Sequence, residues 1–447
     1  MRYECGDVSL AKRYRYSDVD LIALEQRYGR ELLERVYFHI MAFEAIPLAS
    51  LKPDSLCLGP LVRYHTAAFE RAWRTVFLNV SGQWRFQNGL VHYRGPIFES
   101  GPCSDAGSPA QLDPGPLPVL NFTGGGKDSL VAMKLLERAG IAFSSFSYSH
   151  PAYGPAAGQH FLIDHLSDVT AVRLRHRLDI EDEFWEPPAA GLERRFGIRS
   201  RICGETPAAI MGAIPVALAH GYRYLALGHE RSADSENLYW AAAGEPINHQ
   251  WGKSLEAELL LDTYIRGHLL GGLSCFSLLK PIHDVVIFSL LSEDLDALER
   301  THSCNVRKPW CRRCPKCAYV WLNFMAWLPE ERVWPIFQEN LFEAPENEIW
   351  FRALLGLEAH RPFECVGEIA EARLAFALCR HKGLRGPIMD AVAASLPAAA
   401  SPLDQYFRVH RSPDTIPDSI AAGVFPRMER AAERARDDVH RTATAAS

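Results

Sequence analysis

The sequence predicts an α/β fold: a doubly wound parallel sheet, with an N-terminal α+β domain before it and a C-terminal helical region after it. Three observations support this class. Short apolar segments alternate with helical segments from about residue 118 to residue 300, a glycine-rich turn joins the first such strand to a helix, and a proline- and glycine-rich stretch precedes them. Alternating strands and helices are typical of a parallel sheet, which binds ligands at the carboxyl ends of its strands.

The first segment, residues 1–115, is expected to form an α+β domain that ends in a linker. Residues 19–46 show helical spacing, with Ser17 as a candidate cap, and a shorter apolar run covers residues 73–80. Residues 101–118 are rich in glycine and proline, which is typical of a connection between domains. We therefore place a domain boundary there and begin the sheet domain at residue 116.

The sheet domain is expected to cover residues 116–300. In chain order we predict strands at 118–122, 142–147, 168–174 and 222–228, and a helix at Pro207–His220. Residues 301–395 hold a cysteine cluster followed by apolar residues at helical spacing. Residues 396–447 become polar, so we expect a partly disordered tail.

The composition narrows the class of protein. The 447 residues are 48% hydrophobic, carry a formal net charge of −6 and include 11 cysteines. This charge argues against a nucleic-acid partner, because a nucleic-acid surface needs a basic stripe. The sequence has no apolar run of about 18 residues and no signal-peptide pattern, so it predicts a cytoplasmic protein without a membrane partner. In a reducing cytoplasm, clustered cysteines favour metal binding over disulfides.

The most specific motif is Asn-Phe-Thr-Gly-Gly-Gly-Lys-Asp-Ser, at residues 121–129. It follows a short buried strand and opens a helix in which Leu130, Met133 and Leu136 recur at helical spacing. Glycines lack a Cβ, so the chain can turn sharply and point backbone N–H groups at an anion. The positive end of the helix and the charge of Lys127 add to the attraction, so the sequence predicts a phosphate site.

Two common phosphate loops are excluded. A Walker P-loop needs glycine where Asn121 stands and serine or threonine where Asp128 stands, and a dinucleotide fingerprint needs glycine in place of Ser129. The motif instead resembles the PP-loop of ATP pyrophosphatases, which cleave ATP between its α and β phosphates. A glycine-rich turn without a ligand is the alternative.

The resemblance implies roles in binding ATP. The loop residues Gly124, Gly125, Gly126 and Ser129 are expected to bind pyrophosphate, and Lys127 to offset charge on the leaving group. Further along the chain, Gly228-His229 ends a predicted strand as a similar element does in PP-loop enzymes; with Ser147 it completes the expected nucleotide contacts. Mg²⁺ on ATP phosphates requires carboxylates, and the candidates are Asp128, Glu230 and Asp234. Taken alone, Gly228-His229 fits an ordinary loop equally well.

Polar residues gather before an apolar helix at Asn248, His249, Gln250 and Lys253. This segment is expected to contact a polar, anionic substrate, with the lysine binding a phosphate or carboxylate and the histidine transferring a proton. The alternative is a solvated helix start with Ser254 as its cap. A separate pair, Glu364 and Cys365, is a candidate acid/base or thiol site, although a single cysteine is often a small core residue.

Four cysteines lie close together in the sequence: Cys304, Cys311, Cys314 and Cys317. Two Cys-x2-Cys spacings share one cysteine, and four thiolates suit a tetrahedral zinc ion, with the neighbouring lysine and arginines offsetting their charge. Because such a site has no open position, its expected role is to fasten the C-terminal helices to the sheet domain. A redox Cys-x-x-Cys pair and an iron–sulfur cluster are the alternatives.

Five motifs occur together, in a fixed order, across residues 115–370. Through them the chain resembles the family of ATP-dependent epimerases that act on UDP-N-acetylmuramoyl-L-alanyl-L-glutamate in peptidoglycan synthesis. The motifs lie at 124–129, 230–232, 248–254, 311–317 and 362–368. The resemblance implies that ATP and Mg²⁺ convert the terminal L-glutamate to an acyl adenylate, whose carbonyl is a good electron sink. Inversion at Cα and hydrolysis would then give D-glutamate, AMP and pyrophosphate.

The same resemblance assigns candidate residues to this reaction. The base that removes the Cα proton is expected among His249, Glu364 and Cys365, in that order. The UDP-sugar peptide is expected to contact Arg231, Asn248, Gln250 and Lys253. The sequence indicates no oligomeric state.

Three other functions stay open at this point. One is a relative that adenylates or epimerises another peptide carboxylate. A second is a nucleoside-modifying enzyme similar to the deazaguanine synthases, which also carry a four-cysteine zinc site. The third is a nucleotide sensor that binds ATP without turnover. A tRNA thiolase is disfavoured by the charge balance.

Overall fold

The computed structural model describes residues 1–103, 107–185, 189–396, 403–411 and 415–445. Its centre is a seven-stranded sheet in the order β1-β2-β8-β7-β6-β9-β13. Neighbouring strands from β8 to β13 run parallel. They are β8 (Arg175–Asp182), β7 (Phe143–Ser149), β6 (Val119–Phe122), β9 (Tyr224–Leu227) and β13 (Ser274–Ser277). The predicted α/β class with a mainly parallel sheet is confirmed.

Two antiparallel strands, β1 (Arg2–Cys5) and β2 (Val8–Tyr16), extend one edge of this sheet. They come from the segment that the sequence analysis placed in a separate domain. A buried charge cluster fixes β2 at that edge, because Lys12 Nζ lies 2.9 Å from Asp182 Oδ2 on β8 and also contacts Glu44. A buried lysine needs such partners, since an unpaired charge is costly away from water.

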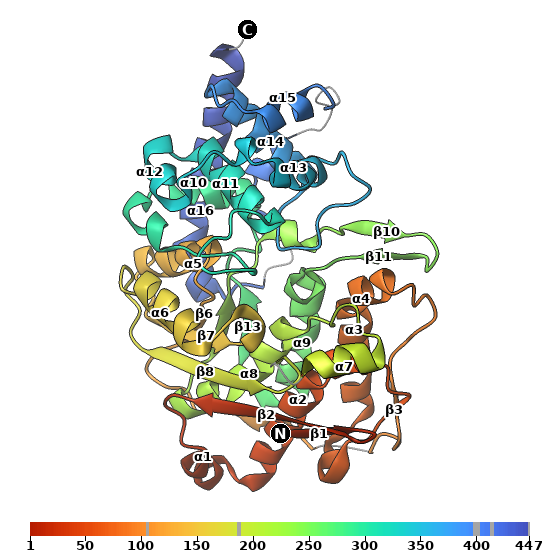
Figure 1. Ribbon diagram of the computed structural model, residues 1–447. Helices are drawn as coiled ribbons and strands as arrows, with labels where there is room; N and C mark the ends of the chain where they lie inside the picture. The colour runs from red at the N-terminus through yellow and green to blue at the C-terminus, as the bar shows by residue number, and fades with distance from the viewer. Residues whose placement is uncertain (104–106, 186–188, 397–402, 412–414, 446–447) are drawn as a thin grey trace.

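Helices cover both faces of the sheet, as a doubly wound fold requires (Figure 1). Successive residues of a strand point to opposite faces of the sheet. Accordingly, the consecutive residues Val119 and Leu120 of β6 belong to two different hydrophobic cores, one on each face. The core that contains Val119 includes α5 (Lys127–Arg138), α6 (Ala156–Ser167) and α10 (Asp284–Leu291). The core that contains Leu120 includes α1 (Leu21–Tyr28), α2 (Arg30–Glu44), α3 (Ala67–Val80), α4 (Gly82–Gln87), α8 (Glu205–His220) and α9 (Leu255–His268).

The C-terminal helices gather at the end of the molecule away from β1 and β2 (Figure 1). They are α11 (Pro315–Trp327), α12 (Glu330–Phe337), α13 (Glu348–Leu354), α14 (Ile369–His381), α15 (Pro387–Ala393) and α16 (Asp418–Ala445). The remaining elements are α7 (Ala189–Phe196) and the short pairs β3 (Ser55–Leu56) with β4 (Ile97–Phe98), β5 (Ala110–Gln111) with β12 (Leu270–Gly271), and β10 (Leu238–Trp240) with β11 (Glu245–Ile247).

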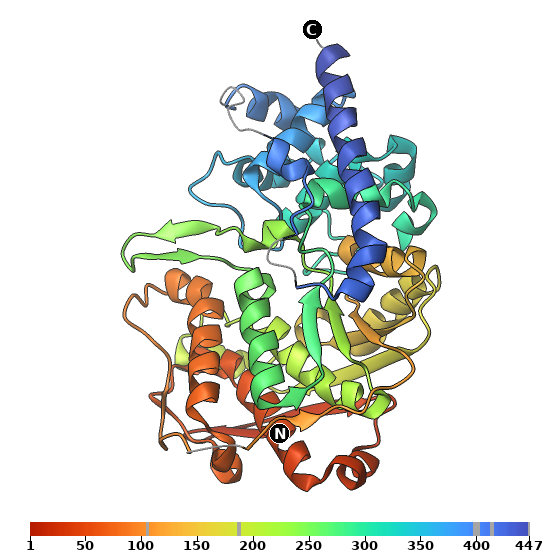
Figure 2. The ribbon, with the colours of Figure 1, turned by 180° about the vertical axis from the view of Figure 1, so that it is seen from behind.

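The long helix α16 differs from the expected partly disordered tail (Figure 2). Its composition is polar, but its apolar residues share one face, which packs against α10 and α5. Buried residues recur three or four positions apart at Ile420, Val424, Met428, Ala431 and Ala435. Residues 397–402, 412–414 and 446–447 of the expected tail lie outside the described residues.

Two other expectations need correction. The strand predicted at 168–174 is wrong, because β8 begins at Arg175 and alternates buried with exposed or half-buried residues. The helical stretch 19–46 is divided at Gly29, whose φ of 85° breaks the helix, and Asp20 rather than Ser17 caps its first part.

Among the residues that the structure describes, every helix is either too short or too polar to cross a membrane.

Candidate functional site

A cavity of about 490 Å³ opens at the carboxyl ends of the parallel strands. Four of the predicted segments contribute residues to its wall. The predicted residues that line it are Gly124, Gly126, Asp128, Ser129, Gly228, His229, His249, Gln250, Lys253, Glu364 and Cys365. Parallel strands place the loops that follow them at one edge of the sheet, so this location follows from the topology.

The glycine loop between β6 and α5 has the geometry of an anion site. Gly125 has a φ of 87°, and Gly126 is the residue before the first turn of α5. Gly124 N donates to Ser129 Oγ at 3.0 Å, which folds the loop back over the helix start. The first N–H groups of a helix have no acceptor within the helix, and the cavity lining at this end of α5 includes Gly126, Asp128 and Ser129.

The loop also packs tightly against the segment before the cysteine cluster. His302 N donates to Gly125 O at 2.9 Å. A Cβ on Gly125 would lie 1.9 Å from the His302 ring, and one on Gly126 would lie 2.7 Å from Ser303 Oγ. These close approaches explain why the loop uses consecutive glycines.

We expect Gly125→Ala to lower the free energy of unfolding by about 1–3 kcal/mol, because it combines a clash with an unfavourable positive φ. Gly124→Ala is the matched control, since its Cβ would meet nothing within 4 Å. Urea denaturation of both variants measures the difference. Equal stability of the two would contradict the packing of the loop on His302.

Lys127 lies below the cavity surface and is not among the residues that line it. Its Nζ contacts Asp128 Oδ1 at 2.6 Å and also Asp284. Burial alone would lower the pKa of Lys127, but the carboxylates of Asp128, Asp284 and Glu230 outweigh it and raise the pKa. The lysine is therefore a fixed positive charge beneath the loop.

Two carboxylates near this lysine have opposite pKa shifts. Burial and the neighbouring carboxylates raise the pKa of Asp128 to about 6, although Lys127 opposes the shift. Burial would also raise the pKa of Glu230, but Lys127 and Lys253 lower it to about 2. Asp128 lines the cavity, whereas Glu230 is 5% exposed and lies behind it.

Several predicted residues lie outside the cavity wall. Ser147 Oγ contacts His160 Nδ1 at 3.2 Å within the sheet packing. Asp234 accepts hydrogen bonds from Lys280 Nζ at 2.8 Å and from Leu255 N at 2.9 Å. The side chains of Asn248 and Arg231 are likewise absent from the wall, and Asn248 Nδ2 instead donates to a backbone carbonyl.

The cavity wall also holds a thiol among charged groups, at Cys365. Lys253 Nζ lies 3.0 Å from Cys365 Sγ. Burial would raise the pKa of this thiol, but Lys253 and Lys316, with His249, lower it well below its usual value. The pKa of Glu364 is raised by burial and by Cys365. A cysteine beside a lysine in this way is held as a thiolate.

Sequence reasoning missed several residues of the cavity: Tyr153, Cys203, Glu205, His302, Lys308 and Lys316. One signal was available, because Cys203-Gly-Glu precedes a helix that enters at the same edge of the sheet. Lys316 was interpreted as offsetting thiolate charge in the cysteine cluster. Its place in the wall means that the segment holding the cluster also shapes the cavity.

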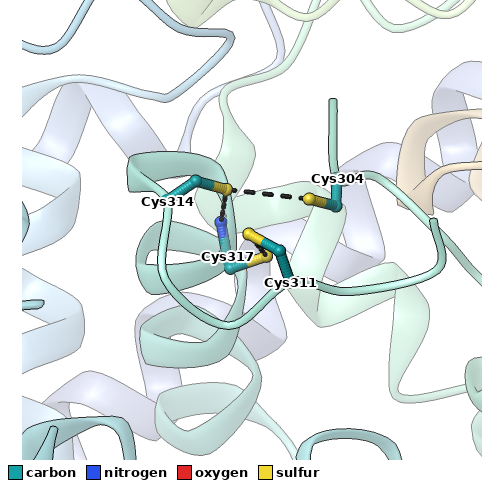
Figure 3. A group of neighbouring side chains, drawn as sticks. All are labelled: Cys304, Cys311, Cys314 and Cys317. Atoms are coloured by element: carbon teal, nitrogen blue, oxygen red, sulfur yellow. Dashed lines mark hydrogen bonds between the residues drawn. The ribbon is translucent and has the colours of Figure 1, made fainter. Parts of the chain in front are cut away.

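The four clustered cysteines converge on one point (Figure 3). Cys304 Sγ is 3.8 Å from Cys314 Sγ, and Cys311 Sγ is 3.8 Å from Cys317 Sγ. Four sulfurs at about 2.3 Å from a zinc ion would be about 3.8 Å apart, so the spacing is compatible with zinc. Backbone N–H groups also donate to these sulfurs, including Cys317 N to Cys314 Sγ at 3.4 Å.

The fold and the cavity define an α/β protein with a glycine-rich loop and a cavity at the carboxyl ends of a mainly parallel sheet. Family models described as the MurL N-terminal domain and the MurL C-terminal domain match residues 204–278 and 298–405. A protein of Micromonospora sp. named UDP-N-acetyl-alpha-D-muramoyl-L-alanyl-L-glutamate epimerase is 33% identical over 343 residues, 73% of this chain and 71% of the relative. The chain belongs to the MurL family.

Two further relatives carry the same name. The protein of Salinispora tropica is 29% identical over 339 residues, which cover 73% of this chain and 69% of the relative. The protein of Xanthomonas oryzae pv. oryzae is 28% identical over 351 residues, which cover 76% of this chain and 73% of the relative. The family resemblance found in the sequence motifs is thus confirmed.

Proposed function

We propose that this protein is a cytoplasmic enzyme that uses ATP to convert the terminal L-glutamate of UDP-N-acetylmuramoyl-L-alanyl-L-glutamate to D-glutamate, for peptidoglycan synthesis. The observation that carries the proposal is a single cavity lined by an anion-binding glycine loop and by a thiol held beside a lysine. The names of the relatives supply the substrate. An epimerase that activates a carboxylate needs both parts within reach of one substrate.

The glycine loop supports the activation step. The N–H groups at the start of α5, with Ser129, would hold the pyrophosphate part of ATP, and Lys127 would supply positive charge from beneath. ATP would supply the adenylyl group that turns the glutamate carboxylate into an acyl adenylate. Gln250 also fits a bound nucleotide, because its Oε1 is buried in the cavity wall and has no hydrogen-bond partner among the described residues.

Asp128 is the side chain placed to hold Mg²⁺, because its carboxylate lines the cavity beside the loop. Glu230, one layer behind, would keep negative charge near the ion. Asp234 is a weaker candidate than Asp128 for a magnesium ligand, because its carboxylate already accepts hydrogen bonds from Lys280 and Leu255.

The basic residues of the wall support binding of an anionic substrate. Lys308 and Lys316 come from the cysteine segment, and Lys253 comes from the start of α9. Burial and the neighbouring Lys316 lower the pKa of Lys308 to about 8. An anion that binds between these lysines would relieve their repulsion, as a substrate diphosphate or carboxylate would.

The four-cysteine cluster would hold a structural zinc ion. The thiols approach tetrahedral spacing without a ligand from outside the cluster, which leaves no open position for chemistry. In this role the ion joins the segment that carries Lys308 to the start of α11.

The test is an incubation with ATP, Mg²⁺ and UDP-N-acetylmuramoyl-L-alanyl-L-glutamate in D₂O. We expect release of pyrophosphate, deuterium at the glutamate Cα, and D-glutamate after hydrolysis. Pyrophosphate without deuterium would refute epimerisation and point to another acyl acceptor. ATP binding without turnover would refute the enzyme and favour a sensor.

A further inference from the structure

We propose that Cys365 and Cys203 are the two catalytic proton-transfer groups of this reaction, with Cys365 taking the Cα proton of L-glutamate and Cys203 delivering a proton to the opposite face. The inference rests on the proposed function. It replaces the order of candidate bases drawn from the sequence, in which His249 came first and Cys203 did not appear.

The two thiols reach the cavity from different parts of the fold. Cys203 directly precedes Gly204, the N-cap residue of α8, and Cys365 lies in the loop before α14. Cys365 is half-buried, and Cys203 is exposed where it lines the cavity. Inversion requires a proton to leave one face of a carbon and another to arrive at the opposite face, so two thiols that enter the cavity on different segments suit it.

Their surroundings give the two thiols different charges. Lys253 Nζ lies 3.0 Å from Cys365 Sγ, which favours the thiolate there. The carboxylate of Glu205 raises the pKa of Cys203, and the enclosing cavity, Cys365 and Glu364 raise it further, which favours the neutral thiol. The cavity therefore presents one thiol as a base and the other as an acid before the substrate arrives.

The other candidate bases already have partners. His249 Nδ1 contacts Gln83 Oε1, and His249 N donates to Asn237 Oδ1 at 2.8 Å. Glu364 Oε2 accepts a hydrogen bond from Asn305 Nδ2 at 3.0 Å. We assign both as positioning residues, with His249 favouring the thiolate form of Cys365.

The proton transfers balance on the acyl adenylate of the substrate. The Cys365 thiolate takes the Cα proton, and the C–H electron pair moves into the carbonyl to form an enolate. The carbonyl then re-forms as Cα takes the proton of the Cys203 thiol from the other face. Water hydrolyses the acyl adenylate to AMP and the UDP-sugar peptide with a terminal D-glutamyl residue, and proton exchange with solvent restores Cys365 as thiolate and Cys203 as thiol.

The experiment compares Cys203→Ala, Cys365→Ala and the control Cys57→Ser with the unmodified chain, using the L-glutamyl substrate, ATP and Mg²⁺ in D₂O. Cys57 is an exposed thiol that does not line the cavity. We expect both alanine variants to lose inversion by about 10²–10⁴-fold, the usual worth of a proton-transfer group, while still releasing pyrophosphate. Cys203→Ala should also place deuterium in the recovered L-glutamate, because Cys365 still removes and returns a proton on that face. Cys365→Ala should place none there.

Inversion within a few-fold of normal in either alanine variant would overturn the inference, and so would deuterium in the L-glutamate of Cys365→Ala. If the unmodified chain releases no pyrophosphate with this substrate, the proposed function fails instead. Iodoacetamide treatment of the unmodified chain tests the same point without a variant. We expect inversion to be lost as either thiol is alkylated and the substrate to protect both, whereas inversion that survives alkylation of both thiols would overturn the inference.

Discussion

Cys317→Ser is expected to remove the bound metal and to unfold the start of the C-terminal helical region. Cys317 is 0% exposed and lies on α11, whose other residues form much of the core beneath the C-terminal helices. Structural zinc contributes about 10–16 kcal/mol to small zinc domains, which is as large as the whole stability of a typical domain. Loss of one of four thiolates should therefore exceed any effect of packing alone.

Metal analysis of the purified chain and urea denaturation measure this prediction. We expect one zinc per chain in the unmodified protein, much less in Cys317→Ser, and a broad transition at lower urea for the variant. Cys379→Ser is the matched control, because Cys379 is also 0% exposed but donates to Leu322 O and lies outside the cluster. Equal stability of the two variants, or iron in place of zinc, would contradict a structural zinc site.

Asp128→Asn is expected to abolish most pyrophosphate release and, at the same time, to stabilise the fold. The pKa of Asp128 is raised to about 6, so ionising it costs more in the folded chain than in the unfolded chain. The cost is absent below pH 4, where the carboxyl is protonated in both states, and it is complete above pH 6. The amide has no such cost, so the variant should gain up to about 3 kcal/mol at pH 8 and little at pH 4.

Urea denaturation at both pH values, without Mg²⁺, checks the stability of this variant, and pyrophosphate release checks its activity. In the unmodified chain the rate should also fall as the pH drops through about 6, because Asp128 becomes protonated. Asp234→Asn is the control and should lower the free energy of unfolding, since it weakens the contacts with Lys280 and Leu255. A loss of stability in Asp128→Asn at pH 8 would contradict this account.

The sequence predicts best where one local pattern fixes one element. The strand before the glycine loop, the loop itself and the helix after it appear at β6 and α5 within a residue or two. The strand β8 lies after the predicted segment 168–174, because its charged residues alternate with buried ones at a period of two and an apolar segment does not mark it. The helix α16 was missed because composition does not show how its apolar residues align.

The candidate site was predictable as a set of motifs but not as a set of contacts. The order of the motifs in a parallel sheet indicates which loops share an edge, and eleven of the predicted residues do line one cavity. The pairing of Lys253 with Cys365 joins segments that are 112 residues apart, and no local pattern encodes it. The contact of Lys127 with Asp284 is likewise not encoded by a local pattern. This buried ion pair keeps Lys127 out of the cavity wall.

The packing of α16 on α5 has a consequence for how the chain reaches this structure. Arg427 donates to Arg138 O across 289 residues, and Ser289 of α10 donates to Ala431 O one turn further along α16. The helix that follows the glycine loop is therefore covered by a segment that is synthesised 289 residues later. Contacts between such distant segments slow folding. We expect the nascent chain to expose the apolar surface of α5 and α10 during most of its synthesis, and chaperones that bind such surfaces to retain it until α16 emerges.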